Sequence, residues 1–228
     1  MQQKALEELE ERIGYHFKDK QLLRQAVTHS SFANEQKINR HEDYERLEFL
    51  GDAVLELVSS EFLFQENKQM TEGQLTRKRA SIVCEVALAY CARSFGLEDF
   101  LLLGKGEEMT GGRGKDSIIS DTMEAVIGAV YIDGGMKNAE TLVKKFILSD
   151  LEHKQLFYDA KTILQEQIQQ KGEGMLHYVL VSEEGPDHDK VFIVEVRIGD
   201  KKIGEGSGRT KKAAEQQAAY KALVSLQR

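Results

Sequence analysis

Two segments of the chain place carboxylates at helical spacing, where they could hold a cation. In the first segment, HEDYERLEFLGDAVLELV (His41 to Val58), Glu45, Glu48 and Asp52 follow one another at intervals of three and four residues. On a helix these side chains share one face, and such a ladder of like charges destabilises an isolated helix. A solvated acidic face is the ordinary interpretation, but lysine partners are missing from it. We therefore interpret this face as a candidate ligand site.

The other face of the same helix is predicted to be apolar, in a stripe formed by Leu47, Leu50, Val54 and Leu57. Gly51 interrupts the helix beside Asp52. A glycine in a helix interior costs about 1 kcal/mol relative to alanine, unless something must approach the backbone closely. The glycine therefore indicates a close neighbour at this point of the helix.

The second segment, SDTMEAVIGAVYIDGG (Ser120 to Gly135), is strongly apolar yet contains Asp121 and Glu124. Their spacing of three residues puts both carboxylates on one side of a helix that should otherwise be buried. Buried carboxylates are costly unless they are paired or bind a cation. Gly128, one turn beyond Glu124, allows another helix to approach closely on that side.

If the two helices cross, four carboxylates meet in one pocket, those of Glu48, Asp52, Asp121 and Glu124. They could ionise together at neutral pH only around a divalent ion. With oxygen ligands alone and no cysteine nearby, Mg²⁺ or Mn²⁺ is the natural occupant. Carboxylate-held Mg²⁺ suits phosphoester hydrolysis, because it activates water and stabilises the charge that develops on the phosphate.

These carboxylates lie in a predicted all-α domain. Apolar spacings typical of helices recur from Met1 to about Leu151, and strand-like alternation is nearly absent. The glycine-rich stretch from Gly104 to Gly114 lacks the residues that end a P-loop. We predict a flexible loop there, with Lys105 and Arg113 near a phosphate backbone.

Three further side chains receive structural interpretations. Cys84 and Cys91 are seven residues apart in a predicted helix, and we expect both to face the core as small apolar residues. His29 is predicted to be a packed or hydrogen-bonded histidine rather than a metal ligand.

After Asp150 the pattern changes to that of a small α+β domain. A helix over Thr162 to Lys171 is followed by three short β-rich runs at 178–181, 191–196 and 202–206, and then by an alanine-rich helix from Lys211 to Leu226. The order α-β-β-β-α places helices on one face of an antiparallel sheet. We therefore predict two domains, 1–151 and 159–228, joined by a linker at 152–158.

The formal net charge of −7 would by itself argue against a nucleic-acid partner, but its distribution matters more. From Asp159 to Arg228 acidic and basic residues are equal in number, so the excess of negative charge lies earlier in the chain. The N-terminus is acidic where a signal peptide is basic and apolar, and no apolar run approaches the roughly 20 residues that span a bilayer. We expect a cytoplasmic protein with no membrane partner.

A family resemblance is carried first by the sequence ERLEFLGDAVL (Glu45 to Leu55). It is very similar to the signature of bacterial ribonuclease III, the endoribonuclease specific for double-stranded RNA. Three further segments resemble the same family and occur in the same order. They are RIGYHFKDKQLLRQAVTHSSF (Arg12 to Phe32), TEGQLTRKRASIV (Thr71 to Val83) and LGKGEEMTGGRGKDSIISDTMEAVIGAVYIDGG (Leu103 to Gly135). An eleven-residue signature followed by a second acidic motif is highly specific.

The resemblance implies an active site at the matching carboxylates. It implies that Glu48, Asp121 and Glu124 bind the metal, Mg²⁺ with Mn²⁺ as a substitute. Asp52 and Glu124 are the implied catalytic residues, with Glu124 essential and Asp52 helping to position the attacking water. None of these four residues is substituted, so nothing in the sequence indicates an inactive enzyme.

The resemblance also implies roles around the active site. Glu45 and Glu72 match accessory acidic positions near the RNA path. Phe49 matches a side chain that inserts into the partner subunit of a homodimer, and an ordinary core aromatic is the alternative interpretation.

The α-β-β-β-α segment resembles a double-stranded RNA-binding domain. The matching RNA contacts are Gln165 and Glu166 on its first helix, Pro186 and His188 in a loop, and Arg209, Lys211 and Lys212 at the start of its last helix. At a helix N-terminus the dipole and the unpaired N–H groups already favour a phosphate. Such contacts recognise the A-form shape of the duplex rather than its base sequence.

The expected protein is a homodimeric, Mg²⁺-dependent endoribonuclease that cleaves double-stranded RNA, without a small-molecule cofactor, and leaves 5′-phosphate and 3′-hydroxyl ends. The resemblance implies that it processes precursor rRNA and some mRNA and tRNA precursors. One alternative is a double-stranded RNA-binding regulator that does not cleave, which the intact carboxylate set disfavours. Another is an enzyme acting on a small phosphorylated metabolite, which should not need the second domain.

Overall fold

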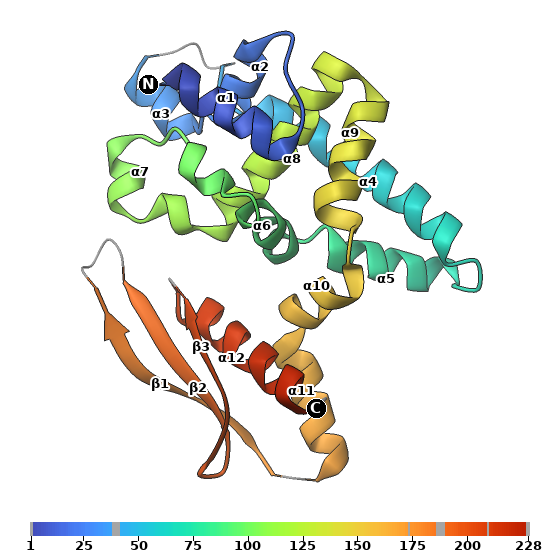
Figure 1. Ribbon diagram of the computed structural model, residues 1–228, viewed down its shortest axis with the longest axis vertical. Coiled ribbons are helices and arrows are strands. Elements are labelled where there is room, and N and C mark those ends of the chain that lie inside the picture. Colours follow the sequence, from blue (N-terminus) through green and yellow to red (C-terminus); the bar gives the residue numbers. More distant parts are fainter. Residues whose placement is uncertain (1, 38–41, 173, 186–189, 209, 227–228) are drawn as a thin grey trace. The chain divides into compact units, whose positions relative to one another are not determined.

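The computed structural model describes residues 2–37, 42–172, 174–185, 190–208 and 210–226. The chain divides into two compact units, Met1–Leu151 and Glu152–Arg228 (Figure 1). The first unit is helical and the second combines a sheet with helices, so the predicted fold class is confirmed. Along the described residues, no helix is both long and apolar enough to cross a membrane.

The first unit is built from helices of very different lengths. In chain order its α-helices are α1 (Gln2–Ile13), α2 (Lys20–Ala26), α3 (Ser30–Glu35), α4 (Glu45–Glu66), α5 (Glu72–Ile82), α6 (Glu85–Arg93), α7 (Lys105–Met109), α8 (Asp116–Gly134) and α9 (Met136–Val143). Short 3₁₀ turns, η1 (Leu97–Phe100) and η2 (Gly112–Gly114), flank α7, and a π-helical turn, η3 (Lys144–Leu148), follows α9.

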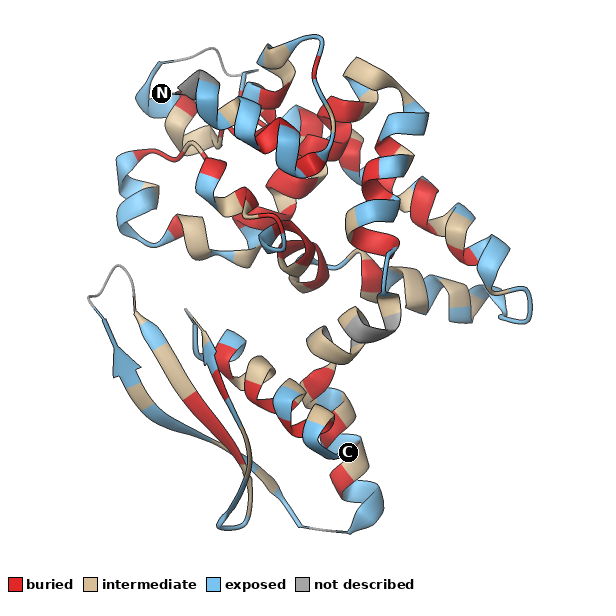
Figure 2. Cartoon of the chain, in the orientation of Figure 1, coloured by how far each residue is buried: buried red, intermediate tan, exposed pale blue. Residues whose placement is uncertain are grey.

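Helix α8 runs through the centre of the first unit. Its residues from Ile118 to Val130 are buried except for the two acidic side chains, Asp121 and Glu124, which are half-buried (Figure 2). Helix α4 crosses α8, and each helix contributes a glycine to the crossing. A β-carbon at Gly51 would collide with the carbonyl oxygen of Glu124, and one at Gly128 with that of Leu47. The close approach expected at both glycines is confirmed.

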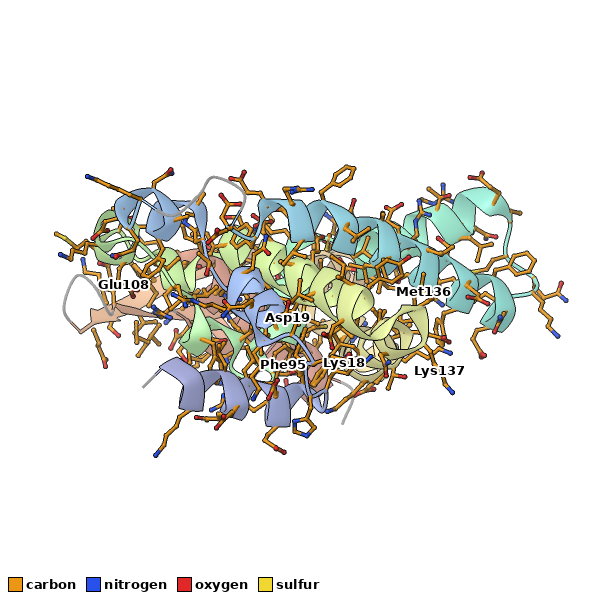
Figure 3. All side chains as sticks on the ribbon, turned by 90° about the horizontal axis from the view of Figure 1, so that it is seen from above. Lys18, Asp19, Phe95, Glu108, Met136 and Lys137 are labelled. Carbon is orange, nitrogen blue, oxygen red and sulfur yellow. The ribbon has the colours of Figure 1, made fainter. Side chains whose placement is uncertain are left out.

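The C-terminal end of α8 is fixed by a set of hydrogen bonds that we call the Asp133 clasp. The Asp133 carboxylate accepts hydrogen bonds from the Tyr15 hydroxyl at 2.7 Å and from the backbone amides of Lys18 and Asp19 at 3.0 and 2.9 Å. Lys18 and Asp19 are labelled in Figure 3. Burial and the adjacent Asp133 raise the pKa of Tyr15 to about 12. The clasp ties the segment before α2 to the central helix.

The predicted apolar stripe of α4 is partly wrong. Leu47 and Val54 are buried, but Leu57 is 56% exposed, and Leu55 and Val58 are buried in its place. The reason is that the close contact with α8 is centred on Gly51, so the buried face follows that residue rather than the outer leucines. Leu57 lies on the flank of α4 that faces a groove described below.

The glycine-rich stretch is more ordered than predicted, since it contains α7 and η2. Arg113 holds it together by donating to both carboxylate oxygens of Glu108 and to the backbone carbonyls of Glu98 and Leu101. These bonds lower the pKa of Glu108. The guanidinium is thereby held by hydrogen bonds within the protein, and its expected place near an RNA backbone stays a prediction.

The expectation for the two cysteines is half wrong. Cys91 is buried within α6, as expected. Cys84 is exposed, because it precedes α6 as the N-cap residue and so does not share the buried face of that helix.

The second unit packs two helices on one face of a three-stranded antiparallel sheet. Its elements are α10 (Leu151–Tyr158), α11 (Ala160–Lys171), β1 (Leu176–Glu184), β2 (Val191–Ile198), β3 (Lys201–Gly208) and α12 (Lys211–Leu226), with strand order β1-β2-β3. The predicted linker at 152–158 is helical, since α10 covers it. In the sheet Tyr178 pairs with Val196, which pairs with Gly204.

The core of the second unit lies between the sheet and its helices. Leu164 and Ile168 of α11 pack with Val196 of β2 and with a row of alanines on α12. Alternate residues of β3 are glycines, and a β-carbon at Gly206 would collide with the backbone of α12. The small side chains of both elements let helix and strand approach closely.

Candidate metal centre and nucleic-acid interface

The crossing of α4 and α8 brings three carboxylates together. Glu48 lies near the start of α4, and Asp121 and Glu124 follow in the second and third turns of α8. One oxygen from each can be chosen so that all three lie within 4.8 Å of one another. The three residues are half-buried, so the cluster is partly exposed to solvent.

Burial and mutual repulsion disfavour ionisation of this cluster. Burial, followed by the charges of Asp52, Asp121 and Glu48, raises the pKa of Glu124 to about 8. Burial and the neighbouring carboxylates likewise raise the pKa of Glu48 to about 7, and burial raises the pKa of Asp121. Without a cation, Glu48 and Glu124 would be largely or partly protonated near neutral pH.

The donor set fits a hard divalent cation. The cluster offers carboxylate oxygens only, and the charges that shift Glu48 and Glu124 are all negative. A divalent ion would remove the cost of gathering these charges, and oxygen-rich sites are those that Mg²⁺ and Mn²⁺ prefer. The three residues can therefore hold such an ion.

Asp52 and Glu45 flank the cluster without belonging to it. Both are exposed on α4, on either side of Glu48 along the helix. Asp52 nevertheless raises the pKa of Glu124 more than any other carboxylate does. The structure thus brings three of the four expected carboxylates within 4.8 Å of one another, and Asp52 is an exposed neighbour of them on α4.

Sequence reasoning missed a buried phenol beside the cluster. Tyr44 directly precedes α4 and is 4% exposed, and its hydroxyl lies 3.5 Å from Oδ2 of Asp121. Burial and the charge of Asp121 raise the pKa of Tyr44 far above its ordinary value, so it stays protonated. The signal available in the sequence was a tyrosine placed immediately before the acidic helix.

His29 packs against the Tyr44 ring and is hydrogen-bonded, as predicted. Its Nδ1 accepts a hydrogen bond from the backbone amide of Ser31 at 3.1 Å and caps α3. Its ring meets the Tyr44 ring edge-on, with 5.5 Å between centroids. Burial lowers the pKa of His29, which keeps the imidazole neutral at neutral pH.

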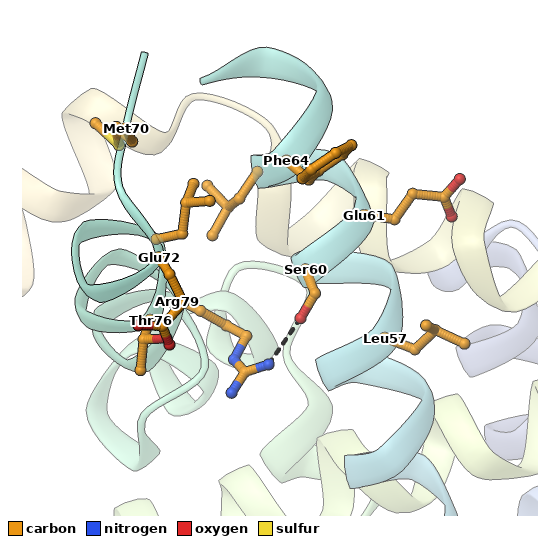
Figure 4. A pocket seen from close by; sticks show the side chains of 10 residues that line it. Leu57, Ser60, Glu61, Phe64, Met70, Glu72, Thr76 and Arg79 are labelled. Carbon is orange, nitrogen blue, oxygen red and sulfur yellow. Dashed lines mark hydrogen bonds between the residues drawn. The ribbon is translucent and has the colours of Figure 1, made fainter. Parts of the chain in front are cut away.

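Glu72 lies at a different place on the same unit. It is the first residue of α5 and lines a groove between α4 and α5 with Ser60, Phe64 and Arg79 (Figure 4). Ser60 follows Glu48 by twelve residues, which is about 18 Å along the helix axis. Within one chain, the structure therefore does not bring Glu72 to the carboxylate cluster.

The groove is largely apolar and includes the exposed aromatic side chain of Phe64 on α4. It encloses about 710 Å³ and is lined by Leu57, Phe64, Met70 and Leu75 among others, with Arg79 bonded to Ser60 across it at 2.8 Å (Figure 4). Phe49 is 82% exposed, so its interpretation as an ordinary core aromatic is wrong. Leu57 and Phe64 are also largely exposed.

The second unit presents two of its expected RNA contacts on each of two helices. Gln165 and Glu166 are exposed on α11, and Lys211 and Lys212 are exposed in the first turn of α12. The ammonium of Lys211 lies 3.4 Å from the carboxylate of Glu183 and over the ring of Phe192. The other three expected contacts, Pro186, His188 and Arg209, lie outside the described residues.

Comparison with protein families accounts for both units. The family described as Ribonuclease-III-like matches residues 19–151, which contain all three clustered carboxylates, and the double-stranded RNA binding motif matches residues 160–226. The chain belongs to the ribonuclease III family. It is an endoribonuclease of that family, with a double-stranded RNA binding motif after its nuclease domain.

Relatives within the ribonuclease III family resemble the chain over nearly its whole length. Ribonuclease 3 of Caldanaerobacter subterraneus subsp. tengcongensis is 49% identical over 221 residues, covering 96% of each chain. Ribonuclease 3 of Geobacillus kaustophilus is 46% identical, covering 96% of this chain and 90% of its own.

Solved structures support the same assignment for the first unit. The nuclease domain of ribonuclease III from Campylobacter jejuni superimposes with a TM-score of 0.60 at 43% identity. That similarity covers 64% of this chain and 99% of the other. The description of that structure refers to flexibility in a region involved in dimer formation.

Proposed function

We propose that the chain hydrolyses phosphodiester bonds of double-stranded RNA in an Mg²⁺-dependent reaction that leaves 5′-phosphate and 3′-hydroxyl ends. The observation that carries this proposal is the convergence of Glu48, Asp121 and Glu124 at the crossing of α4 and α8. The acids repel one another and no positive charge shifts Glu48 or Glu124. The matches to the ribonuclease III family and to the double-stranded RNA binding motif support double-stranded RNA as the substrate.

In this mechanism Glu48, Asp121 and Glu124 hold the cation, which is Mg²⁺, with Mn²⁺ as a substitute. When bound, the ion supplies positive charge that lowers the pKa of water and stabilises the developing charge on the phosphate. Asp52, exposed beside the cluster, accepts a hydrogen bond from the attacking water and orients it for in-line attack. Glu45 lies one turn before Glu48 on the exposed side of α4, where it faces the RNA path.

The domain boundaries follow from the same assignment. The catalytic domain comprises residues 1–151, the linker 152–158 and the RNA-binding domain 159–228. The division into units at Leu151 and the two family matches support this organisation. In the RNA-binding domain Gln165 and Glu166 contact one minor groove, and Lys211 and Lys212 contact phosphates. Pro186, His188 and Arg209 complete the proposed contact set.

The protein acts as a homodimer in this proposal. Phe49, Leu57 and Phe64 expose apolar surface along α4, and the groove that Leu57 and Phe64 line is large enough to receive side chains of a second copy. The Campylobacter jejuni nuclease domain is described with a region of dimer formation. Since Glu72 lines this groove, we place its accessory role at the dimer interface rather than at its own cluster.

The biological setting follows from the family. The proposed substrates are precursor rRNA and some mRNA and tRNA precursors, processed in the cytoplasm without a small-molecule cofactor. A regulator that binds double-stranded RNA without cutting it is the alternative function, and the carboxylate cluster is the feature that disfavours it.

The decisive experiment incubates the full chain with a long RNA duplex, with and without Mg²⁺, beside single-stranded RNA of the same sequence. We expect Mg²⁺-dependent cleavage of the duplex alone. Glu124→Gln should abolish cleavage and leave duplex binding in EDTA intact, whereas Glu140→Gln, on the surface of α9, should cleave normally. Binding without any cleavage by the unaltered chain would support the regulator instead.

A further inference from the structure

We propose that Tyr44 is a positioning residue of the metal centre: its hydroxyl restrains the carboxylate of Asp121, so that cation affinity depends on a side chain outside the ligand set. This inference rests on the proposed function, because it takes the carboxylate cluster as the cation site. Tyr44 touches neither the cation nor RNA in this role and acts only through Asp121. The contact is the 3.5 Å separation between the Tyr44 hydroxyl and Oδ2.

The Tyr44 hydroxyl is the group that is placed to donate a hydrogen bond to Asp121. Among the described residues, two hydroxyl groups approach Asp121, those of Tyr44 and of Ser120, which lies 3.4 Å from Oδ1. A serine hydroxyl has a single proton, and that of Ser120 is directed to the backbone carbonyl of Ser117 at the shorter distance of 2.9 Å. The phenol therefore supplies the donor that Asp121 can use.

Tyr44 is the N-cap residue of α4, and contacts from outside the two ligand-bearing helices hold it in place. The Tyr44 amide donates to the carbonyl of Thr28 at 2.9 Å, and the ring packs edge-on against His29. His29 is held in turn, because its amide donates to the carbonyl of Leu102 at 3.1 Å and its ring caps α3. This arrangement fixes the phenol relative to α8.

The length of the contact indicates how strongly it acts. At 3.5 Å it exceeds the usual O–H···O range of 2.5–3.0 Å, so the phenol limits rotation of the carboxylate without locking it. Groups that hydrogen-bond to metal ligands typically change metal affinity or activity by about 10- to 100-fold when they are removed. For a long contact we expect the lower end of that range.

The test removes the hydroxyl while keeping the ring. Mn²⁺ is titrated into the full chain with Tyr44 intact and with Tyr44→Phe, and binding is followed by calorimetry. The matched control is Tyr15→Phe, which deletes another phenol that donates to an aspartate of α8, about 18 Å along the helix from Asp121. Both variants lose one Tyr–Asp hydrogen bond, but only one of these bonds reaches the cluster.

We expect Tyr44→Phe to weaken Mn²⁺ binding about tenfold and to raise the Mg²⁺ concentration for half-maximal cleavage by a similar factor. Tyr15→Phe should change neither quantity by more than about twofold, and the KM for duplex RNA should be the same in both variants. Equal Mn²⁺ affinity in the two variants would overturn the role of Tyr44.

The failure of this inference can be told apart from that of the proposed function. If the unaltered chain binds Mn²⁺ and Glu124→Gln does not, the cluster is the cation site, and the Tyr44 result stands or falls on its own. Absence of Mn²⁺ binding by the unaltered chain would overturn both. A fall in thermal midpoint for Tyr44→Phe beyond that of Tyr15→Phe, with unchanged Mn²⁺ affinity, would show that Tyr44 is merely structural.

Discussion

Gly51 of α4 packs directly against the backbone carbonyl of Glu124, so the helix crossing and the carboxylate cluster form one structural feature. Gly128 of α8 meets the carbonyl of Leu47 in the same way on the other side of the contact. Because these two glycines have no side chain, they allow the close spacing between α4 and α8. That spacing in turn sets the distances among the three carboxylates.

Gly51→Ala is expected to disrupt the centre and the fold together. The added methyl group would overlap the Glu124 carbonyl, and overpacking of this kind typically costs about 1–3 kcal/mol of unfolding free energy. Denaturant unfolding and Mn²⁺ titration should both register the change. Gly106→Ala on α7 is the control, because a β-carbon there meets nothing within 4 Å and alanine is the better helix former. Equal stability of the two variants would contradict this account of the crossing.

Stability of the metal-free protein should fall as pH rises through the neutral range. Folding raises the pKa of Glu48 from 4.5 to about 7 and that of Glu124 from 4.5 to about 8. Between pH 4.5 and 8 the folded state therefore binds more protons than the unfolded state, so the contribution of these groups is lost as pH increases. Denaturant unfolding in EDTA at several pH values measures the slope.

Two comparisons test the cause of that slope. Saturating Mn²⁺ should stabilise the protein most at the upper end of this pH range, because protons no longer compete for the carboxylates. The double variant Glu48→Gln with Glu124→Gln should flatten the dependence in EDTA. A slope that persists in the double variant would assign it to other groups.

Lys211→Ala combined with Lys212→Ala should weaken duplex RNA binding and make it less dependent on salt. Each lost phosphate contact reduces the slope of log K against log salt by about 1. Binding in EDTA across a salt series provides the measurement. Lys221→Ala, near the other end of α12, serves as the control for loss of an exposed lysine. If the double variant keeps the original slope, these lysines do not contact phosphate.

Phe49→Ala should weaken self-association with little effect on the stability of the isolated chain. The side chain is 82% exposed, so its removal leaves no cavity within the fold. Sedimentation velocity over a concentration series gives the dimer dissociation constant. Met109→Ala removes an equally exposed apolar side chain from α7 and should leave the dimer unchanged. Unaltered association of the Phe49 variant would place the interface elsewhere.

Local spacing predicted the carboxylate cluster, because carboxylates at i, i+3 and i+4 share a helix face. The glycines at 51 and 128 further indicated where two helices meet, which is confirmed. Periodicity did not reveal how wide the buried face is, which is why Leu57 was misplaced. It also could not show that Arg113 binds Glu108 and two carbonyls, because such bonds depend on the path of the folded loop.

The role we assign to Tyr44 was beyond sequence reasoning for a different reason. Its partner Asp121 lies 77 residues away, and nothing in the local pattern joins the two. Predicting that contact requires the position of the segment around Thr28, which is itself fixed by hydrogen bonds with Leu102. A contact between single side chains that are far apart in the sequence can be identified only once the packing of the whole core is known.

The alternate glycines of β3 also restrict how this protein can diverge. Gly204, Gly206 and Gly208 each lie so close to α12 that any larger residue would push the helix away from the sheet. Such a shift would displace Lys211 and Lys212 as a rigid unit. We therefore expect RNA affinity to change in evolution by substitutions on the outward side of α12. The residues through which α12 and β3 contact each other should stay unchanged.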